Sequence, residues 1–277
     1  MNNKAEHPQP YRGAMYDIVL TFGDSITQFG GNPAHNGWVN SLSHLFERRM
    51  DVLNRGFSGY NTNDARGVVH LVLPRTKSLP GANPASSAAT ATTATTNLSR
   101  PFPNFSPKVQ LLLIFFGAND AVLKPGYQHV PLDVFAANMR YLVSLVKDPE
   151  SEYYSPETRV ALITPPPLGE SLYNRTSAGS DVNPIKRTNA MAKVYSEAVK
   201  DAANDLGVPY IDLWSSIEDR VHRAALAEQA SPSAAASPYD GYERYLLDGL
   251  HLNANGNQLL FKLIESLIDS NWPELRS

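Results

Sequence analysis

The stretch 109-VQLLLIFF-116, followed at once by Gly117, decides the fold expected for this chain. Apolar residues fill every position of it except Gln110. Such a near-continuous apolar run is typical of a strand buried on both faces, as in the middle of a parallel sheet. Parallel neighbours need a crossover connection, which is usually a helix. The run therefore predicts an α/β domain whose sheet is covered by helices on both faces.

On both sides of this run, short apolar segments rich in strand-forming residues alternate with helical patterns. The other strands are expected at residues 16–22, 52–54, 159–164 and 208–211. Helices are expected at residues 37–50, 131–146, 184–205 and 255–270. Together with the central run, these segments predict a mostly parallel sheet of five strands.

The composition places the chain among ordinary globular proteins. Its 277 residues are 42% hydrophobic and 18% charged, enough for one sizeable α/β domain. A net charge of −3 without a dense Lys/Arg cluster argues against a nucleic-acid partner or a polybasic membrane anchor. No apolar run approaches the length of a membrane span, and residues 1–15 lack the apolar core of a signal peptide. The chain has no cysteine, which excludes disulfides and a cysteine nucleophile, and the expected location is cytoplasmic.

Two low-complexity stretches interrupt the pattern without adding a domain. Residues 78–107 are rich in Ala, Thr, Ser and Pro and poor in large apolar side chains. They bury too little surface to offset their ordering entropy, which predicts a flexible insertion. Residues 227–238 predict a second, smaller mobile loop. We therefore expect one domain over residues 16–277, preceded by an extension at residues 1–15.

A polar turn, 23-GDSIT-27, follows the first expected strand. The carboxyl ends of parallel strands face the ligand crevice of an α/β sheet, so Ser25 lies where a nucleophile would be useful. A helix N-cap is the alternative role for Ser25. Asp24 is expected to organise the turn. The Gly-x-Ser-x-Gly elbow of common α/β-hydrolases is absent from the chain, so serine chemistry would need another frame.

A second polar segment, 248-DGLH-251, lies near the C-terminal end of the sequence. A serine hydroxyl is a weak nucleophile until a base takes its proton, and that base is usually a histidine held in one tautomer by an acid. Residues three apart in a turn can meet, so Asp248 could bond to Nδ1 of His251 while Nε2 faces Ser25. Alternatively, Asp248 caps the turn and His251 is packed.

Two further segments, 54-NRGFSGYNT-62 and 117-GAND-120, also follow apolar strands. Acyl transfer needs donors for the developing oxyanion, and Gly56 could offer a backbone N–H and Asn119 a side-chain amide. Ordinary turn chemistry is the alternative for both residues. Asp120 is expected to cap the loop after its strand. Taken together, the four segments fill each role of acyl transfer once.

These four blocks, in this order, resemble the GDSL or SGNH hydrolase family. The resemblance implies a three-layer α/β/α sandwich of flavodoxin-like appearance, without a metal or other cofactor. It also implies a triad of Ser25, Asp248 and His251, and an oxyanion hole made by Ser25 N–H, Gly56 and Asn119. The insertion at residues 78–107 is longer than the family pattern leads us to expect, which leaves the accessible substrate size open.

Within the family, FGDSIT, NRGFSGYNT, FFGANDA and DGLHLN are similar to the fungal isoamyl-acetate-hydrolysing esterase group. This likeness implies hydrolysis of short-chain acyl esters, such as acetate esters of small alcohols, and a homodimer is a family-level expectation. Deacetylation of a carbohydrate or another metabolite is an alternative, and so is a non-catalytic binding protein. Substrate-lining positions are predicted at Phe57, Phe116 and Pro167, with core packing as the alternative for both phenylalanines. Four further histidines, His35, His44, His70 and His129, lack the spacing of metal ligands with one another, so solvated or structural roles are expected for them.

Overall fold

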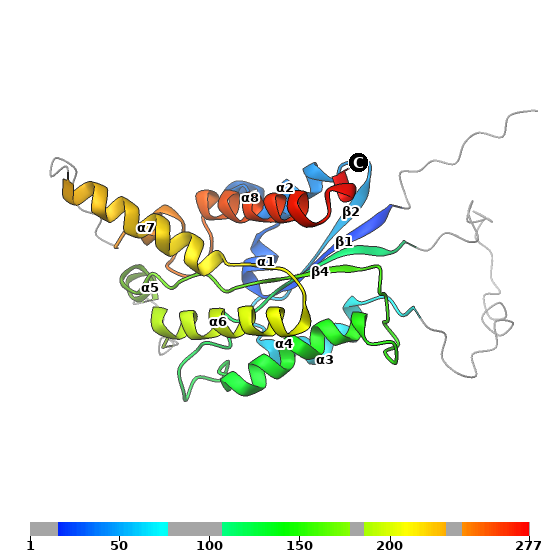
Figure 1. The fold of residues 1–277 in the computed structure, drawn as a ribbon. Coiled ribbons are helices and arrows are strands. Elements are labelled where there is room, and N and C mark those ends of the chain that lie inside the picture. The colour runs from blue at the N-terminus through cyan, green and yellow to red at the C-terminus, as the bar shows by residue number, and fades with distance from the viewer. Residues whose placement is uncertain (1–15, 77–106, 178–185, 231–239, 277) are drawn as a thin grey trace, which may run out of the picture.

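Five parallel strands form one sheet in the order β2-β1-β3-β4-β5 (Figure 1). The structure is a computed structural model that describes residues 16–76, 107–177, 186–230 and 240–276. The strands are β1 Asp17–Gly23, β2 Met50–Gly56, β3 Val109–Phe115, β4 Arg159–Ile163 and β5 Tyr210–Ile211. The helices are α1 Ser25–Phe29, α2 Trp38–Leu45, α3 Thr62–Val72, α4 Leu132–Lys147, α5 Glu170–Ser177, α6 Asn189–Leu206, α7 Leu213–Ala230 and α8 Ala254–Asn271. Short 3₁₀ turns lie at Pro33–His35, Tyr242–Arg244 and Pro273–Arg276. The predicted α/β fold with a central five-stranded sheet is confirmed.

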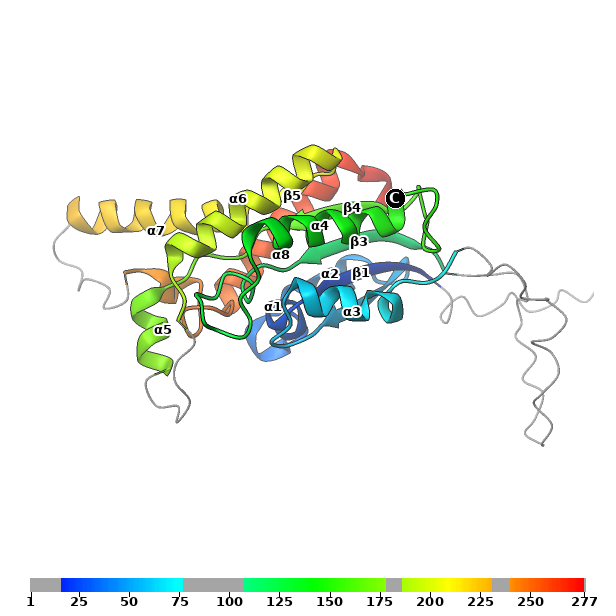
Figure 2. The ribbon, with the colours of Figure 1, turned by 90° about the horizontal axis from the view of Figure 1, so that it is seen from below.

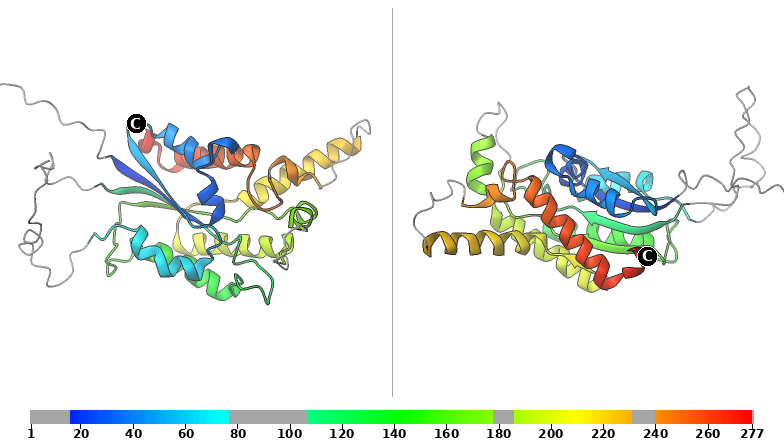
Figure 3. Two further views of the ribbon diagram at one scale, coloured as in Figure 1. Left: turned by 180° about the vertical axis from the view of Figure 1, so that it is seen from behind. Right: turned by 90° about the horizontal axis from the view of Figure 1, so that it is seen from above.

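The central strand β3 supplies apolar side chains to both helical layers. Leu112 and Ile114 belong to a core cluster with residues of α3, α4 and α6. Leu111 and Leu113 alternate with them and belong to a second cluster with residues of α2, α7 and α8. Successive side chains of a strand point to opposite faces, so an unbroken apolar run is what a doubly covered strand requires. Figure 3 shows α2 and α8 on the opposite side of the sheet from α3, α4 and α6.

Side-chain caps fix several helix ends. Asn61 caps α3, and Asp64 returns a hydrogen bond to the Asn61 backbone, which completes a capping box. Thr188 caps α6, and Gly207 ends it in the left-handed conformation. This cap explains why α6 begins at Asn189, later than the expected residue 184. The expected helix at residues 37–50 is likewise shorter, since α2 ends at Leu45.

The sequence patterns gave no range for four of the eight described helices, α1, α3, α5 and α7. α1 has five residues, too few for a periodic pattern, and α5 is also short. α7 continues through residues 227–230, which corrects the expectation of a mobile loop at that point. The rest of that expected loop, nearly all of the expected insertion at 78–107, and the expected extension at 1–15 lie outside the described residues.

The residues that flank the insertion lie at the amino end of the sheet, where the strands begin. Lys108 accepts a hydrogen bond from Ile18 N–H (2.8 Å), and its own N–H donates to Asp17 Oδ1 (2.9 Å). Thr76 N–H donates to Glu152 O (3.0 Å) in the turn that precedes β4. In Figure 2 the chain leaves the sheet toward the insertion at the end away from α1 and α5.

The last 3₁₀ turn is held at the same end. Glu274 forms an ion pair with Arg159 at the start of β4, at 2.7 Å between N and O. Two hydrogen bonds of Trp38 link α8 and α1. Asn257 of α8 accepts from the Trp38 N–H (3.4 Å), and the Trp38 indole donates to Ile26 O (3.3 Å). The fully buried Trp38 therefore connects α8 to α1. Among the described helices, none is long and apolar enough to cross a membrane.

Candidate active site

Ser25 is the first residue of α1, directly after β1. The N-cap of this helix is Asp24, whose Oδ1 accepts from Ile26 N–H at 2.9 Å. The expectation that Asp24 organises the turn is thereby confirmed, and the alternative that Ser25 is the cap is wrong. As an N-terminal helix residue, Ser25 leaves its own N–H without a partner in the described chain. Both its hydroxyl and its N–H are therefore available at the carboxyl end of the sheet.

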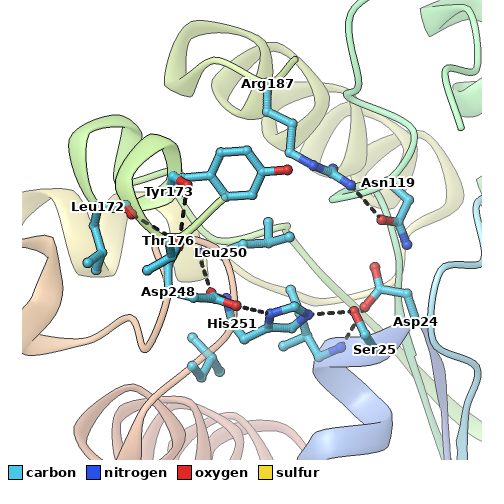
Figure 4. A network of polar contacts seen from close by, with 12 residues as sticks. Asp24, Ser25, Asn119, Leu172, Tyr173, Thr176, Arg187, Asp248, Leu250 and His251 are labelled. Atoms are coloured by element: carbon cyan, nitrogen blue, oxygen red, sulfur yellow. Dashed lines mark hydrogen bonds and ion pairs between the residues drawn. The ribbon is translucent and has the colours of Figure 1, made fainter. Parts of the chain in front are cut away.

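The structure brings Ser25, His251 and Asp248 together in a single hydrogen-bonded line (Figure 4). Ser25 Oγ lies 2.9 Å from His251 Nε2, and His251 Nδ1 lies 2.7 Å from Asp248 Oδ2. A carboxylate only accepts, so the Nδ1 proton faces Asp248 and the Nε2 lone pair faces the hydroxyl. The contact between Ser25 and His251 joins residues that are 226 positions apart in the sequence.

Asp248 performs both of the roles that the sequence left open. Its Oδ1 accepts from the backbone N–H groups of Leu250 (3.0 Å) and His251 (2.8 Å), which caps the turn. Its Oδ2 holds the imidazole. Burial by itself would raise the pKa of Asp248, but the hydrogen bonds and charge of His251 and the bond from Leu250 lower it to about 2. The carboxylate is therefore ionised at neutral pH.

Two further carboxyl groups at this end of the sheet, those of Asp24 and Asp120, are buried. Burial raises the pKa of Asp24 to about 6, against the opposing effects of the Ile26 N–H and the charges of His251 and Arg187. Burial also raises the pKa of Asp120 to about 7, and the charge of Asp24 adds to the rise. Asp120 was expected to cap its own loop. It instead accepts from the N–H (2.9 Å) and hydroxyl (2.5 Å) of Thr62, so it ties the loop after β3 to the start of α3.

Gly56 has a structural role that corrects its assignment as an oxyanion donor. Its N–H donates to Asn54 Oδ1 at 2.9 Å and is therefore not available to a substrate. It ends β2 opposite Gly23, where a Cβ would lie 2.0 Å from the Gln28 nitrogen. The glycine is needed for the close approach of α1 to β2.

Gly59, three residues further on, has the free donor that Gly56 lacks. Its φ is +83°, and its N–H has no hydrogen-bond partner in the described chain. The loop lies against α1, since the neighbouring Ser58 N–H donates to Gln28 Oε1 at 2.8 Å. The sequence contains both glycines in NRGFSGYNT, but nothing in its pattern shows that the strand extends to Gly56. That extension is what leaves Gly59 as the loop glycine.

Asn119 follows β3, and its amide lies close to Ser25 and Asp24 in Figure 4. One N–H of the amide donates to Tyr60 O at 2.8 Å, and the other is not used by the described chain. Its Oδ1 accepts from Arg187 at 2.9 Å. Asn119 thus presents an oriented donor at the same end of the sheet as the Ser25 N–H.

The predicted substrate-lining residues separate into core and half-exposed positions. Phe116 is fully buried and packs edge-to-face on Phe22 with centroids 5.0 Å apart, and Pro167 is also buried. Phe116 therefore has the core-packing role that the sequence offered as the alternative, and the burial of Pro167 argues against a substrate-lining position. Phe57 is half-buried and stacks on Tyr60 at 5.1 Å.

Phe29 is a residue that the sequence analysis missed. It lies in α1, is 44% exposed, and places its ring 5.2 Å from the His251 ring. Leu250 and Tyr173 of α5 also lie beside the triad, as Figure 4 shows. An exposed aromatic ring beside the histidine offers an apolar rim to a substrate. No group of three or more His, Cys, Asp or Glu residues that could hold a metal occurs in the described part of the chain.

Together with the fold and the site, the comparisons with known proteins show that this protein is a carboxylic ester hydrolase. The chain belongs to the GDSL-like lipase/acylhydrolase family, which it matches over residues 21–259. It is similar to the isoamyl acetate-hydrolyzing esterase 1 homolog of Bos taurus, at 35% identity over 93% of this chain and 83% of that protein. The Homo sapiens homolog is 34% identical, with 94% and 85% covered.

Solved structures show the same fold at low sequence identity. The lipase/acylhydrolase from Enterococcus faecalis superposes with a TM-score of 0.53 at 20% identity, covering 92% of this chain and 96% of that one. An acetylxylan esterase from Geobacillus stearothermophilus gives 0.54 at 18% identity, with 92% and 94% covered.

Proposed function

We propose that this protein is a serine esterase that works through an acyl-enzyme intermediate. The observation that carries the proposal is the 2.9 Å contact between Ser25 Oγ and His251 Nε2, continued by Asp248 at 2.7 Å. Nucleophile, base and orienting acid lie within hydrogen-bond reach in the order that acyl transfer needs.

The reaction has two steps. Ser25 Oγ attacks the ester carbonyl carbon while His251 Nε2 takes the hydroxyl proton. The bond to the alcohol oxygen then breaks, and His251 donates the proton to the leaving alcohol. In the second step water attacks the acyl-Ser25 ester, His251 takes a proton from the water, and the acid leaves as Ser25 recovers its proton.

Three donors serve the tetrahedral oxyanion in this proposal: the N–H of Ser25, the N–H of Gly59 and the amide of Asn119. Each has a hydrogen that the described chain does not use. Donors that are already fixed in place stabilise developing charge without reorganisation. Asn119→Ala should therefore lower kcat by about 10²–10³, and unchanged turnover would remove Asn119 from the oxyanion hole.

The proposed substrates are short-chain acyl esters of small alcohols, of the acetate type. The names of relatives at 34–35% identity support this choice, and the exposed Phe29 ring beside His251 is compatible with a small apolar alcohol group. The same machinery would also deacetylate a sugar or another metabolite. The two substrate classes can be distinguished by hydrolysis rates. These are measured on p-nitrophenyl esters of increasing chain length, on isoamyl acetate and on acetylated sugars.

Covalent labelling tests the nucleophile. A fluorophosphonate should label the wild type and the control Ser43→Ala, which alters an exposed serine of α2, but not Ser25→Ala. Labelling that persists in Ser25→Ala would show that another serine reacts. Absence of hydrolysis of any activated acetate ester by the wild type would instead favour a binding protein of the same fold.

A further inference from the structure

We propose that Arg187 and Gln128 form a brace that orients both oxyanion donors outside α1, Asn119 directly and Gly59 through Gln128. This inference rests on the proposed function, because it assigns positioning residues to the same reaction. Neither residue needs to touch the substrate.

The guanidinium of Arg187 makes three contacts with the loop that follows β3. It donates to Asn119 Oδ1 (2.9 Å) and Gln128 Oε1 (3.0 Å) through one nitrogen and to Ala118 O through another. The preceding residue is fixed on the same loop, since Lys186 O accepts from Leu123 N–H at 2.9 Å. Figure 4 shows the Arg187 side chain reaching toward Asn119.

The charge of the guanidinium decides which way each amide faces. An arginine side chain only donates and is always protonated in proteins, so each amide must turn its oxygen toward it. The Asn119 NH₂ then points away from Arg187, toward Tyr60 O and the Ser25 side of the site. A reversed Asn119 amide would place an NH₂ group against the guanidinium and would offer the oxyanion an oxygen.

The same reasoning carries the orientation on to Gly59. With its Oε1 held by Arg187, Gln128 donates through Nε2 to Gly59 O at 2.7 Å. Gln128 is 4% exposed, so solvent does not compete for this bond. The bond fixes the carbonyl of a residue whose φ is +83° and whose N–H remains free. The Arg187 guanidinium therefore orients both donors, the Asn119 amide directly and the Gly59 N–H through Gln128.

Arg187 also places positive charge beside the oxyanion site. Within the part of the chain that the structure describes, its three acceptors are neutral oxygens and it forms no ion pair with a carboxylate. A hydrogen bond from a cation to the Asn119 oxygen polarises the amide and strengthens its N–H donors. Its Nε is buried and has no hydrogen-bond partner among the described residues, so the three contacts on the loop are made by the two terminal nitrogens.

A double-mutant cycle tests whether Arg187 acts through Asn119. Arg187→Met should lower kcat by about 10- to 100-fold, below the full effect of losing Asn119, with KM within about threefold of the wild type. In an Asn119→Ala background, the further loss from Arg187→Met should shrink to about threefold or less. Affinity for a trifluoromethyl ketone, which forms a tetrahedral anionic adduct with the serine, should fall in parallel with kcat/KM.

Arg66→Met is the matched control. Arg66 also donates to an asparagine oxygen, Asn138 Oδ1 at 3.1 Å, and lies over the Tyr141 ring, but it belongs to α3 and makes no contact with the proposed donors. It should leave kcat unchanged. Arg187→Lys keeps the charge without the fork and should fall between the wild type and Arg187→Met, which keeps the proposal testable if the methionine variant folds poorly.

The contact of Gln128 with Gly59 is tested with Gln128→Met. Because Gln128 acts through Gly59, Gln128→Met should lower kcat by the same factor in the wild type and in the Asn119→Ala background, about threefold or less, which is the loss that Arg187→Met retains in that background. Equal losses from Arg187→Met in both backgrounds, a rise in KM alone, or no loss at all would overturn the brace. If Asn119→Ala itself leaves kcat unchanged, the proposed oxyanion hole fails and the brace fails with it.

Discussion

The carboxylate of Asp248 is bonded to His251 twice. Its Oδ2 lies 2.7 Å from the ring Nδ1, and its Oδ1 accepts from the backbone N–H at 2.8 Å. The same side chain therefore fixes the position of the histidine along the chain and the rotation of its ring. The four-residue turn from Asp248 to His251 is enough to do both.

Asp248→Asn should keep the turn but prevent His251 from accepting the proton of Ser25. The asparagine oxygen can still accept from the backbone, but its NH₂ would face Nδ1 and force the ring proton onto Nε2, where it cannot accept from Ser25. We expect kcat to fall by about 10³–10⁴ with a small change in KM. Steady-state kinetics beside the exposed Asp219→Asn control measures this. A loss below tenfold would show that Asp248 does not set the tautomer.

Asp120→Asn should flatten the pH dependence of stability. Because the pKa of Asp120 is raised from 3.8 to about 7, the folded protein keeps a proton that the unfolded chain releases, so the free energy of unfolding falls as pH rises through this window. The amide has no such proton to lose. Between pH 5 and 8 the variant should lose less unfolding free energy than the wild type, by on the order of 1 kcal/mol. Urea unfolding at both pH values checks it, and parallel curves would contradict it.

Phe29→Ala should affect substrate binding more than folding. The ring is 44% exposed, so its removal leaves no cavity in the core, while the apolar rim beside His251 is lost. For isoamyl acetate we expect KM to rise by about threefold to tenfold, with a smaller rise for methyl acetate. Leu71→Ala, which removes a more exposed apolar side chain of α3, serves as control. Equal rises for both esters would argue against an apolar contact.

Deleting residues 78–97 should leave the kinetics unchanged. Thr76 and Lys108, which flank the insertion, are anchored at the amino end of the sheet, and Ser25 lies at the carboxyl end. We expect the same kcat and KM, and a change in unfolding free energy below about 1 kcal/mol because loop-closure entropy depends weakly on length. A changed KM would mean that the insertion reaches the site.

The strands were predictable because burial on both faces leaves an unbroken apolar run, as at residues 109–116. Helices with a clear apolar stripe were predictable for a similar reason, whereas α1 has five residues and holds its place through the Asp24 cap and Trp38. Composition alone could not show that residues 227–230 continue α7.

A site residue could be predicted where only one residue of the motif suits the role. The prediction was less successful where two residues of one motif suit the same role. Gly56 and Gly59 lie in the same motif, and the hydrogen bond from Gly56 to Asn54 distinguishes them. The roles of Arg187 and Gln128 could not be predicted, since nothing in the sequence places Arg187 against Asn119 and Gln128, which lie 68 and 59 positions before it.

The two ends of the sheet also differ in what is attached to them. The start of β1 at Asp17, the flanks of the insertion and the Glu274–Arg159 pair near the C-terminal end all lie at the amino end. An enzyme tethered to a solid support from that end would keep Ser25 and His251 turned toward the bulk solution. Three separate attachment points offer this orientation, which suits the protein to immobilised use without redesign of its catalytic surface.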